Sequence, residues 1–240
     1  MLDDSKAKLL ATSIKSWLDF QILCKREVLL SEAYLAQPIG EFLRSHFTEE
    51  IVSEWNHPQI SQPNRGRPRQ VDYVLKSRDI GRALAGIEAK WIGDTPVSKQ
   101  RILNDVLRLE CLKSEDGNSM KRYFMVAGRA GKLSDNCFDL GYHTGNGGTR
   151  NFTDQILHFG EGSGRTEVRS CKDNLRDFYS SFQDSYNIKL PVSYKSSRVS
   201  DEMGVKSRAV IWRVKSVAGR SEFSPEHYWD TEPPSVESEC

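Results

Sequence analysis

Apolar residues recur at helical spacing through the first fifty residues of the chain. Between residues 4 and 23 an apolar side chain returns every three or four positions, which predicts an amphipathic helix. Its apolar positions are Leu10, Ile14, Trp17 or Leu18, and Ile22. A second helical pattern covers residues 25–47, and we expect Pro38 to kink or interrupt it, because proline lacks a backbone N–H.

Shorter apolar runs follow, separated by polar and glycine-containing segments, and they indicate a sheet. We expect strands at residues 51–55, 71–76, 84–92, 123–128 and 208–217, and helices at 98–113 and 171–186. We expect loops at 57–70, 141–149 and 160–164. This pattern predicts an α/β fold with a mixed central sheet flanked by helices. We expect one domain over residues 1–223 and an acidic, disordered tail over 224–240.

Composition narrows the class of protein. Of the 240 residues, 38% are hydrophobic and 28% are charged, as in ordinary globular proteins. The chain holds no apolar run of about 18 residues, the length of a membrane span. Residues 1–6 include acids and lack the apolar segment of a secretory signal, so we expect a cytoplasmic protein. The five cysteines are scattered without a C-x-x-C pair, which argues against a disulfide framework and against a zinc site.

Basic residues are concentrated in one part of the chain. Between residues 65 and 101, nine Lys or Arg accompany four Asp or Glu, whereas the net charge of the whole chain is +1. The last twenty residues carry six acids and no Lys or Arg. A basic segment in an otherwise balanced chain is a candidate surface for nucleic-acid phosphates. An ordinary solvated surface is the alternative.

Two expected strands in this basic segment each place charge on one face. Side chains alternate between the faces of a strand, so Val71, Tyr73 and Leu75 share one face and leave Asp72 on the other. In the next strand the apolar set is Ala85, Ile87, Ala89 and Trp91. That alternation leaves Gly86, Glu88 and Lys90 on the opposite face.

The register of these two strands brings the acids together. If they form an antiparallel hairpin that turns near Ile80 and Gly81, Asp72 lies opposite Glu88. Carboxylates at opposed positions repel each other unless a cation lies between them. Mg²⁺ fits such a pair, because it takes hard oxygen ligands and retains waters or substrate phosphate. We therefore predict Asp72 and Glu88 as metal ligands, with the Ala89 carbonyl as a further ligand.

Lys90 lies two residues beyond Glu88 on the same face of its strand. An ammonium group beside the ion is suited to position the attacking water or to offset charge that develops on the phosphate. The alternative is a structural salt bridge in a surface hairpin, with Lys90 paired to Glu88 or Asp72.

These residues resemble the PD-(D/E)XK superfamily, which includes restriction endonucleases, Holliday-junction resolvases and many phage-defence nucleases. The resemblance covers residues 25–130 and rests on the order of a helical glutamate, a strand aspartate, an E-x-K strand and a helix. The matching segments are 69–74, 86–91 and the helix around 104–109. The literal Pro-Asp pair is absent, because Val71 precedes Asp72.

The resemblance implies a restriction-endonuclease-like fold and a Mg²⁺-dependent nuclease, with Mn²⁺ as an alternative ion. Its catalytic residues are Asp72, Glu88 and Lys90, assisted by a glutamate for which Glu32 is our choice, ahead of Glu41 and Glu54. DNA is the implied substrate, in bacterial restriction or phage defence, with a homodimer or a defence-system protein as a possible assembly.

The basic loop before Asp72 is the expected site of DNA contact. Its candidate phosphate-binding residues are Arg65, Arg67 and Arg69, and Lys99, Arg101 and Arg108 extend the track along the following helix. The main alternative to a nuclease is a nucleic-acid-binding or scaffold protein that keeps the fold without catalysis. A third is a regulatory domain that acts through its acidic tail.

Overall fold

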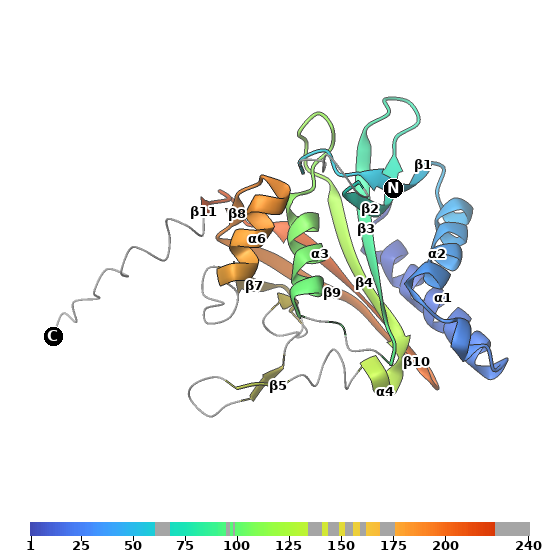
Figure 1. The fold of residues 1–240 in the computed structure, drawn as a ribbon. Coiled ribbons are helices and arrows are strands. Elements are labelled where there is room, and N and C mark those ends of the chain that lie inside the picture. Colours follow the sequence, from blue (N-terminus) through green and yellow to red (C-terminus); the bar gives the residue numbers. More distant parts are fainter. Residues whose placement is uncertain are drawn as a thin grey trace.

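A mixed sheet of seven strands forms the centre of the computed structural model (Figure 1). The structure describes residues 1–60, 68–94, 97, 99–133, 141–143, 149–151, 156–158, 162–168 and 176–223. The strands of the sheet are β1 (Glu50–Asn56), β2 (Gln70–Lys76), β3 (Ala83–Ile92), β4 (Lys121–Arg129), β7 (Gly164–Glu167), β9 (Ser193–Met203) and β10 (Ser207–Ser216).

The strands lie in the order β1-β2-β3-β4-β10-β9-β7. Strands β3 and β4 are parallel, and the other neighbours are antiparallel. The parallel pair is joined by helix α3 (Lys99–Cys111), as a parallel connection requires a crossover. Two short pairs accompany the sheet: β5 (Gly141–His143) with β6 (Thr149–Asn151), and β8 (Leu190–Pro191) with β11 (Glu222–Phe223).

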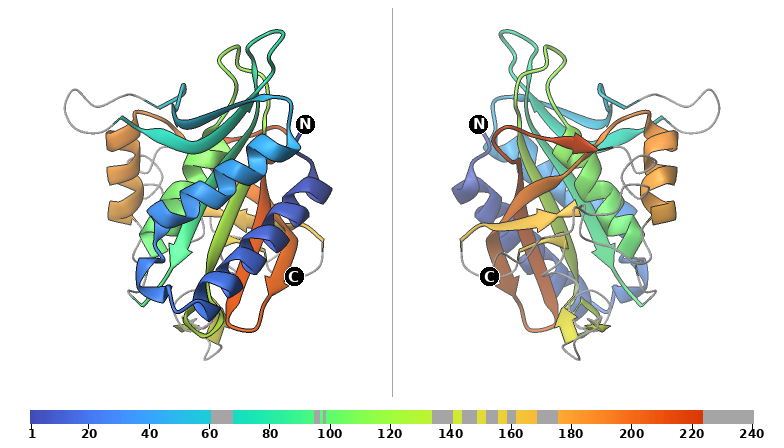
Figure 2. Two further views of the ribbon diagram at one scale, coloured as in Figure 1. Left: turned by 90° about the vertical axis from the view of Figure 1, so that its right-hand side faces the viewer. Right: turned by 90° about the vertical axis from the view of Figure 1, so that its left-hand side faces the viewer.

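Helices cover both faces of the sheet, as Figures 1 and 2 show. Helices α1 (Asp4–Leu23) and α2 (Glu32–His46) lie on one face, and α3 and α6 (Arg176–Tyr186) lie on the other. The short helices η1 (Glu27–Leu29) and α4 (Ala130–Leu133) occupy connections. The expected mixed central sheet flanked by helices is therefore confirmed.

The alternation of the strands divides the core into two clusters. One contains Tyr73, Leu75, Ile87 and other residues that pack under α1 and α2. The other contains Val74, Phe124 and other residues that pack under α3 and α6. Because both faces are covered, the polar face of β2 and β3 is not an open surface. Glu88 of β3 is 4% exposed and pairs with Arg108 of α3.

Capping residues set the helix boundaries in the first fifty residues. The Asp3 carboxylate accepts a hydrogen bond from the backbone N–H of Lys6 at 2.9 Å, and α1 begins at Asp4 as predicted. The second helical segment is shorter than the pattern indicated, because Lys25 has φ 57° and the chain restarts at the cap residue Ser31. Pro38 lies inside α2 and does not interrupt it.

Several sequence-based expectations need correction or fall outside the described part of the chain. Strand β9 was not predicted, because it is rich in Ser and charged residues and has little apolar alternation. Residues 141–143 form a strand and residue 149 begins another, where a loop was expected. The tail 224–240, residues 61–67 and residues 171–175 of the expected last helix lie outside the described ranges. None of the helices in the described part combines the length and apolar character of a membrane span.

A buried histidine fixes α3 against the end of β1. His57 is 1% exposed, and its Nε2 lies 2.9 Å from the carbonyl oxygen of Arg108. Its Nδ1 accepts a hydrogen bond from the backbone N–H of Gln59 at 3.3 Å, so the neutral ring with a proton on Nε2 satisfies both contacts. Burial lowers the pKa of His57 to about 4.

We expect this histidine to weaken the fold in acid. The unfolded chain takes up a proton below the ordinary pKa of 6.5, whereas folded His57 resists protonation until about pH 4. Its contribution is therefore intact above pH 6.5 and is lost as the pH falls from 6.5 to 4, by about 3 kcal/mol at most. Urea unfolding at pH 7 and pH 4.5 measures the loss. His57→Gln should flatten this pH dependence, and an equal loss in both proteins would contradict the assignment.

Candidate metal and nuclease site

The β2–β3 hairpin has the register that the sequence indicated. Tyr73 lies opposite Ile87, Val74 opposite Gly86, and Leu75 opposite Ala85. The turn contains Gly81, which has φ 64°, a conformation that favours glycine. The same register continued by one residue places Asp72 opposite Glu88.

The hairpin opens at Asp72, and the aspartate side chain enters the opening. Backbone pairing of β2 with β3 ends at Tyr73 and Ile87. Beyond that pair, the N–H of Ala89 donates a hydrogen bond of 2.7 Å to Oδ2 of Asp72. The alternation of β2 side chains between the two faces of the sheet is also interrupted here. Val71 packs in the cluster under α3, whereas Tyr73 and Leu75 pack in the cluster under α1 and α2, so the expected common face of these three residues is wrong.

Glu88 is a buried acid beside Asp72. It is 4% exposed, and the charge of Asp72 acts on its carboxyl group. Burial and, after it, the charge of Asp72 raise the pKa of Glu88 well above its ordinary value. Burial likewise raises the pKa of Asp72, against the hydrogen bond from Ala89, and Asp105 adds to the increase. The two carboxyl groups thus lie together in a place where ionising both is costly.

Lys90 lies next to this pair but bonds to other acids. Its Nζ is 3.0 Å from Oδ2 of Asp105 on α3 and 3.1 Å from Oε1 of Glu32 at the start of α2. Burial acts against the ammonium form, but the attraction of Asp105 and Glu32 outweighs it and raises the pKa of Lys90. Lys90 is therefore a fixed cation at neutral pH, and its partners are not those of the salt-bridge alternative, Glu88 and Asp72.

A second cation, Arg108, forms an ion pair with Glu88. Its Nη2 donates to Oε1 of Glu88 in a short contact and to the carbonyl oxygen of Gln70 at 2.5 Å, and its Nη1 lies 3.7 Å from Asp105. The attraction of Glu88 and Asp105 raises the pKa of Arg108, although burial opposes it. Arg108 was expected on the outer phosphate-binding track. The structure instead turns it inward, because α3 packs over the acids of β3.

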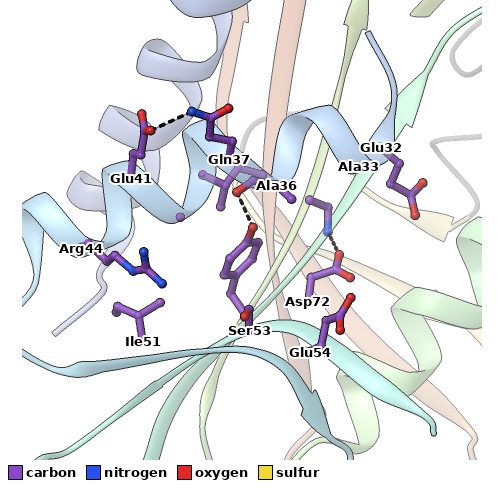
Figure 3. Close-up of a pocket in the computed structure, with 14 residues that line it drawn as sticks. Glu32, Ala33, Ala36, Gln37, Glu41, Arg44, Ile51, Ser53, Glu54 and Asp72 are labelled. Atoms are coloured by element: carbon purple, nitrogen blue, oxygen red, sulfur yellow. Dashed lines mark hydrogen bonds between the residues drawn. The ribbon is translucent and has the colours of Figure 1, made fainter. Parts of the chain in front are cut away.

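A cavity of about 790 Å³ opens beside the acids, between α2 and the first two strands. Glu32, Glu54 and Asp72 line one end of it, and Glu41 and Arg44 line the other (Figure 3). Glu54 has φ 51°, in the left-handed region that bulky residues avoid, at the position of β1 across from Asp72. Of the candidate assisting glutamates, Glu32 is the one bonded to Lys90, while Glu41 accepts a hydrogen bond from Gln37.

A second hollow, of about 440 Å³, lies on the α3 side of Glu32 and Lys90. It is lined by Gln100, Arg101, Asn104 and Phe178, and Glu32 borders both hollows. Asp72 lines the first hollow and Lys90 lines the second, so the Glu32–Lys90 ion pair lies between the two.

The structure describes some of the candidate DNA-binding residues and places them in different surroundings. Arg65 and Arg67 lie outside the described residues. The Arg69 guanidinium lies over the Tyr186 ring, 5.1 Å from its centroid. Lys99 begins α3, and Arg101 is exposed at the mouth of the second hollow. Their role in DNA contact stays a prediction.

The chemistry of the donor set fits a small divalent ion. Asp72 and Glu88 offer two converging carboxyl groups, and the Ala89 carbonyl faces β2 with its N–H, because both groups of a strand residue point to the same neighbour. Mg²⁺ requires only one or two carboxylates and keeps waters in its other positions. Within the described residues, no three His, Cys, Asp or Glu side chains are arranged as a metal-binding group, so the ion would rely on carbonyl and water ligands as well.

Comparison with known proteins gives no family. No protein-family model matches the chain, and neither curated proteins nor solved structures gave a significant match.

Sequence reasoning assigned no role to Asp105, which the structure places at the centre of the cation network. It is 8% exposed and pairs with both Lys90 and Arg108. The available signal was an acidic residue among the apolar positions of an amphipathic helix. Asp105 lies between Leu103 and Val106, on a helix that had to pack against the sheet.

We expect Asp72→Asn to stabilise the protein. The raised pKa of Asp72 means that its ionised form costs stability, and this cost appears as the pH rises above the ordinary value of 3.8. Asparagine still accepts the Ala89 hydrogen bond but carries no charge, so unfolding at pH 7 should need roughly 1 kcal/mol more. Urea denaturation in EDTA measures the difference.

Asp19→Asn is the matched control. Asp19 has a lowered pKa, because hydrogen bonds from Ser207, Lys206 and Val205 overcome the effect of burial. Its substitution should destabilise the protein at pH 7. A loss of stability in both variants would show that Asp72 is an ordinary structural acid.

Proposed function

We propose that this chain is a Mg²⁺-dependent nuclease that hydrolyses phosphodiester bonds of DNA, on a restriction-endonuclease-like fold of the PD-(D/E)XK kind. The observation that carries the proposal is the meeting of Asp72 and Glu88 in a partly opened hairpin, with Lys90 two residues on. The order α2, β1, β2, β3, α3 and β4 supports it, since the acids occupy the second and third strands.

The charges of the site support metal binding. Four carboxyl groups, those of Asp72, Glu88, Asp105 and Glu32, surround two cations, Lys90 and Arg108. If every group is ionised, the cluster lacks two positive charges, which is the charge of one Mg²⁺ ion. Burial and, after it, the charge of Asp72 raise the pKa of Glu88, so a divalent ion between the two carboxyl groups would reduce the cost of ionising both.

Each residue of the site has a separate role in the proposed hydrolysis. Asp72, Glu88 and the Ala89 carbonyl would hold the ion, which supplies a water of lowered pKa and polarises the scissile phosphate. Lys90, held by Glu32 and Asp105, places a permanent positive charge beside the attacking water and the phosphate oxygens. Glu32 orients that ammonium. The two hollows on either side of the Glu32–Lys90 pair provide space for the strand before and after the scissile bond.

DNA as the substrate, and a role in bacterial restriction or phage defence, follow from the resemblance alone. One observation favours a second function, a nucleic-acid-binding or scaffold protein without catalysis. Arg108 and Lys90 already pair with acids of the site, and such pairing is also how a purely structural cluster is satisfied.

Cleavage assays distinguish a nuclease from a nucleic-acid-binding or scaffold protein without catalysis. The chain is incubated with plasmid, linear and single-stranded DNA and with RNA, in Mg²⁺ or in EDTA. Lys90→Ala should lower the rate on the order of a hundredfold or more, because it removes a preorganised charge at the transition state. Lys76→Ala is the matched control, since Lys76 is an ion-paired lysine of the same sheet, bonded to Glu115 away from the site. Cleavage that survives EDTA or Lys90→Ala would contradict the mechanism, and DNA binding without cleavage would favour the second function.

Metal binding should also show in the thermal stability. An ion that binds the folded chain at a concentration a hundred times its Kd stabilises it by about 2.7 kcal/mol. Mg²⁺ or Mn²⁺ should therefore raise the Tm of the wild type by several degrees and leave that of Asp72→Asn unchanged. Equal shifts in the two proteins would place the ion elsewhere.

A further inference from the structure

Arg108 approaches the proposed metal ligands from the helix above them. Its guanidinium bonds to Glu88, one of the two carboxyl groups that would hold the ion. Glu88 is 4% exposed, so few groups can approach its carboxyl oxygens. A guanidinium and a divalent ion at the same buried carboxylate would also repel each other strongly, because little water screens them.

The guanidinium is incompletely satisfied in this position. Its Nη2 serves both Glu88 and the Gln70 carbonyl, while its Nε is buried and has no hydrogen-bond partner within the described residues. A buried donor without a partner costs free energy that a small rotation can recover. Arg108 therefore pairs with Glu88 without using its full hydrogen-bonding capacity.

Two further contacts would retain the side chain near the site if it left Glu88. Nη1 lies 3.7 Å from Asp105, an acid of the same helix, and the Gln70 carbonyl lies 2.5 Å from Nη2. The move from Glu88 toward Asp105 is short and keeps the charge paired. This distinguishes Arg108 from an arginine whose only partner is the buried carboxylate.

We propose that Arg108 competes with the divalent ion for Glu88, and that metal binding displaces its guanidinium toward Asp105. The inference rests on the metal centre of the proposed function and adds to it a positioning residue that competes with the ion. The arginine keeps the buried acids neutralised between metal-binding events, at the expense of metal affinity.

Removal of the competing cation should tighten metal binding. A charge-assisted hydrogen bond to a buried carboxylate must be broken before the ion binds, so Arg108→Gln should lower the Kd for Mn²⁺ about tenfold or more. The measurement is isothermal titration of the full chain with MnCl₂ in a chelator-free buffer at pH 7. Asp72→Asn in the Arg108→Gln background should abolish the gain, because the added affinity depends on the same centre.

A matched control separates competition from general loosening of the fold. Arg208 is a buried arginine paired to Asp201 at 2.7 Å, outside the site. Arg208→Gln removes an equally enclosed arginine and should leave the Kd for Mn²⁺ unchanged. A gain in both variants would overturn the proposal.

The wild type offers a measurement that does not depend on how the variant folds. The side-chain Nε–H signal of Arg108, assigned by its loss in Arg108→Lys, should shift as Mg²⁺ is added, since the guanidinium leaves Glu88 and its surroundings change. An Nε–H signal that does not move while Mg²⁺ binds would overturn the proposal.

The outcomes distinguish this inference from the proposed function. If wild-type binding is lost in Asp72→Asn but Arg108→Gln binds Mn²⁺ no more tightly, Arg108 does not compete and the metal centre remains. If neither the wild type nor Arg108→Gln binds Mn²⁺ at millimolar concentration, the metal centre fails and the inference fails with it.

Discussion

The enclosure of two carboxyl groups between diverging strands governs the chemistry of this protein. Pairing of β2 with β3 stops at Tyr73, and the Asp72 side chain takes the place of a backbone acceptor for the Ala89 N–H. Glu88 lies opposite Asp72 when this register is continued by one residue, and it is buried under α3. Two acids in a poorly hydrated space need positive charge nearby, and the surrounding structure supplies it from several elements.

The cations come from both sides of the acids and from different elements of the chain. Lys90 is part of the same strand as Glu88, whereas Arg108 comes from α3, and Asp105 links the two. Glu32 belongs to α2, a helix on the opposite face of the sheet, and it reaches Lys90 near the start of that helix. The centre thus depends on the packing of helices on two faces, which explains why its polar groups belong to one network.

Much of the fold was predictable from alternation and spacing. The α1 boundaries, strands β1 to β4 and the hairpin register agree with the sequence pattern, because local periodicity and a glycine turn determine them. Strand β9 was not predictable in this way. It is polar in sequence, and its place in the sheet depends on pairing with β10 and, over its first residues, with β7. The break of the second helical segment at Lys25 was also missed, since a positive φ at lysine has no sequence signature.

The local pattern of the chain is sufficient to show which residues of the candidate site are neighbours. Asp72, Glu88 and Lys90 lie on two strands of a short hairpin, and a period of two with a defined turn leaves little freedom in their relative positions. The balance of their charges depends on the packing of the whole fold. The partners Asp105, Arg108 and Glu32 come from helices whose rotation and depth depend on packing against the sheet, and no local pattern specifies which of their polar side chains turn inward.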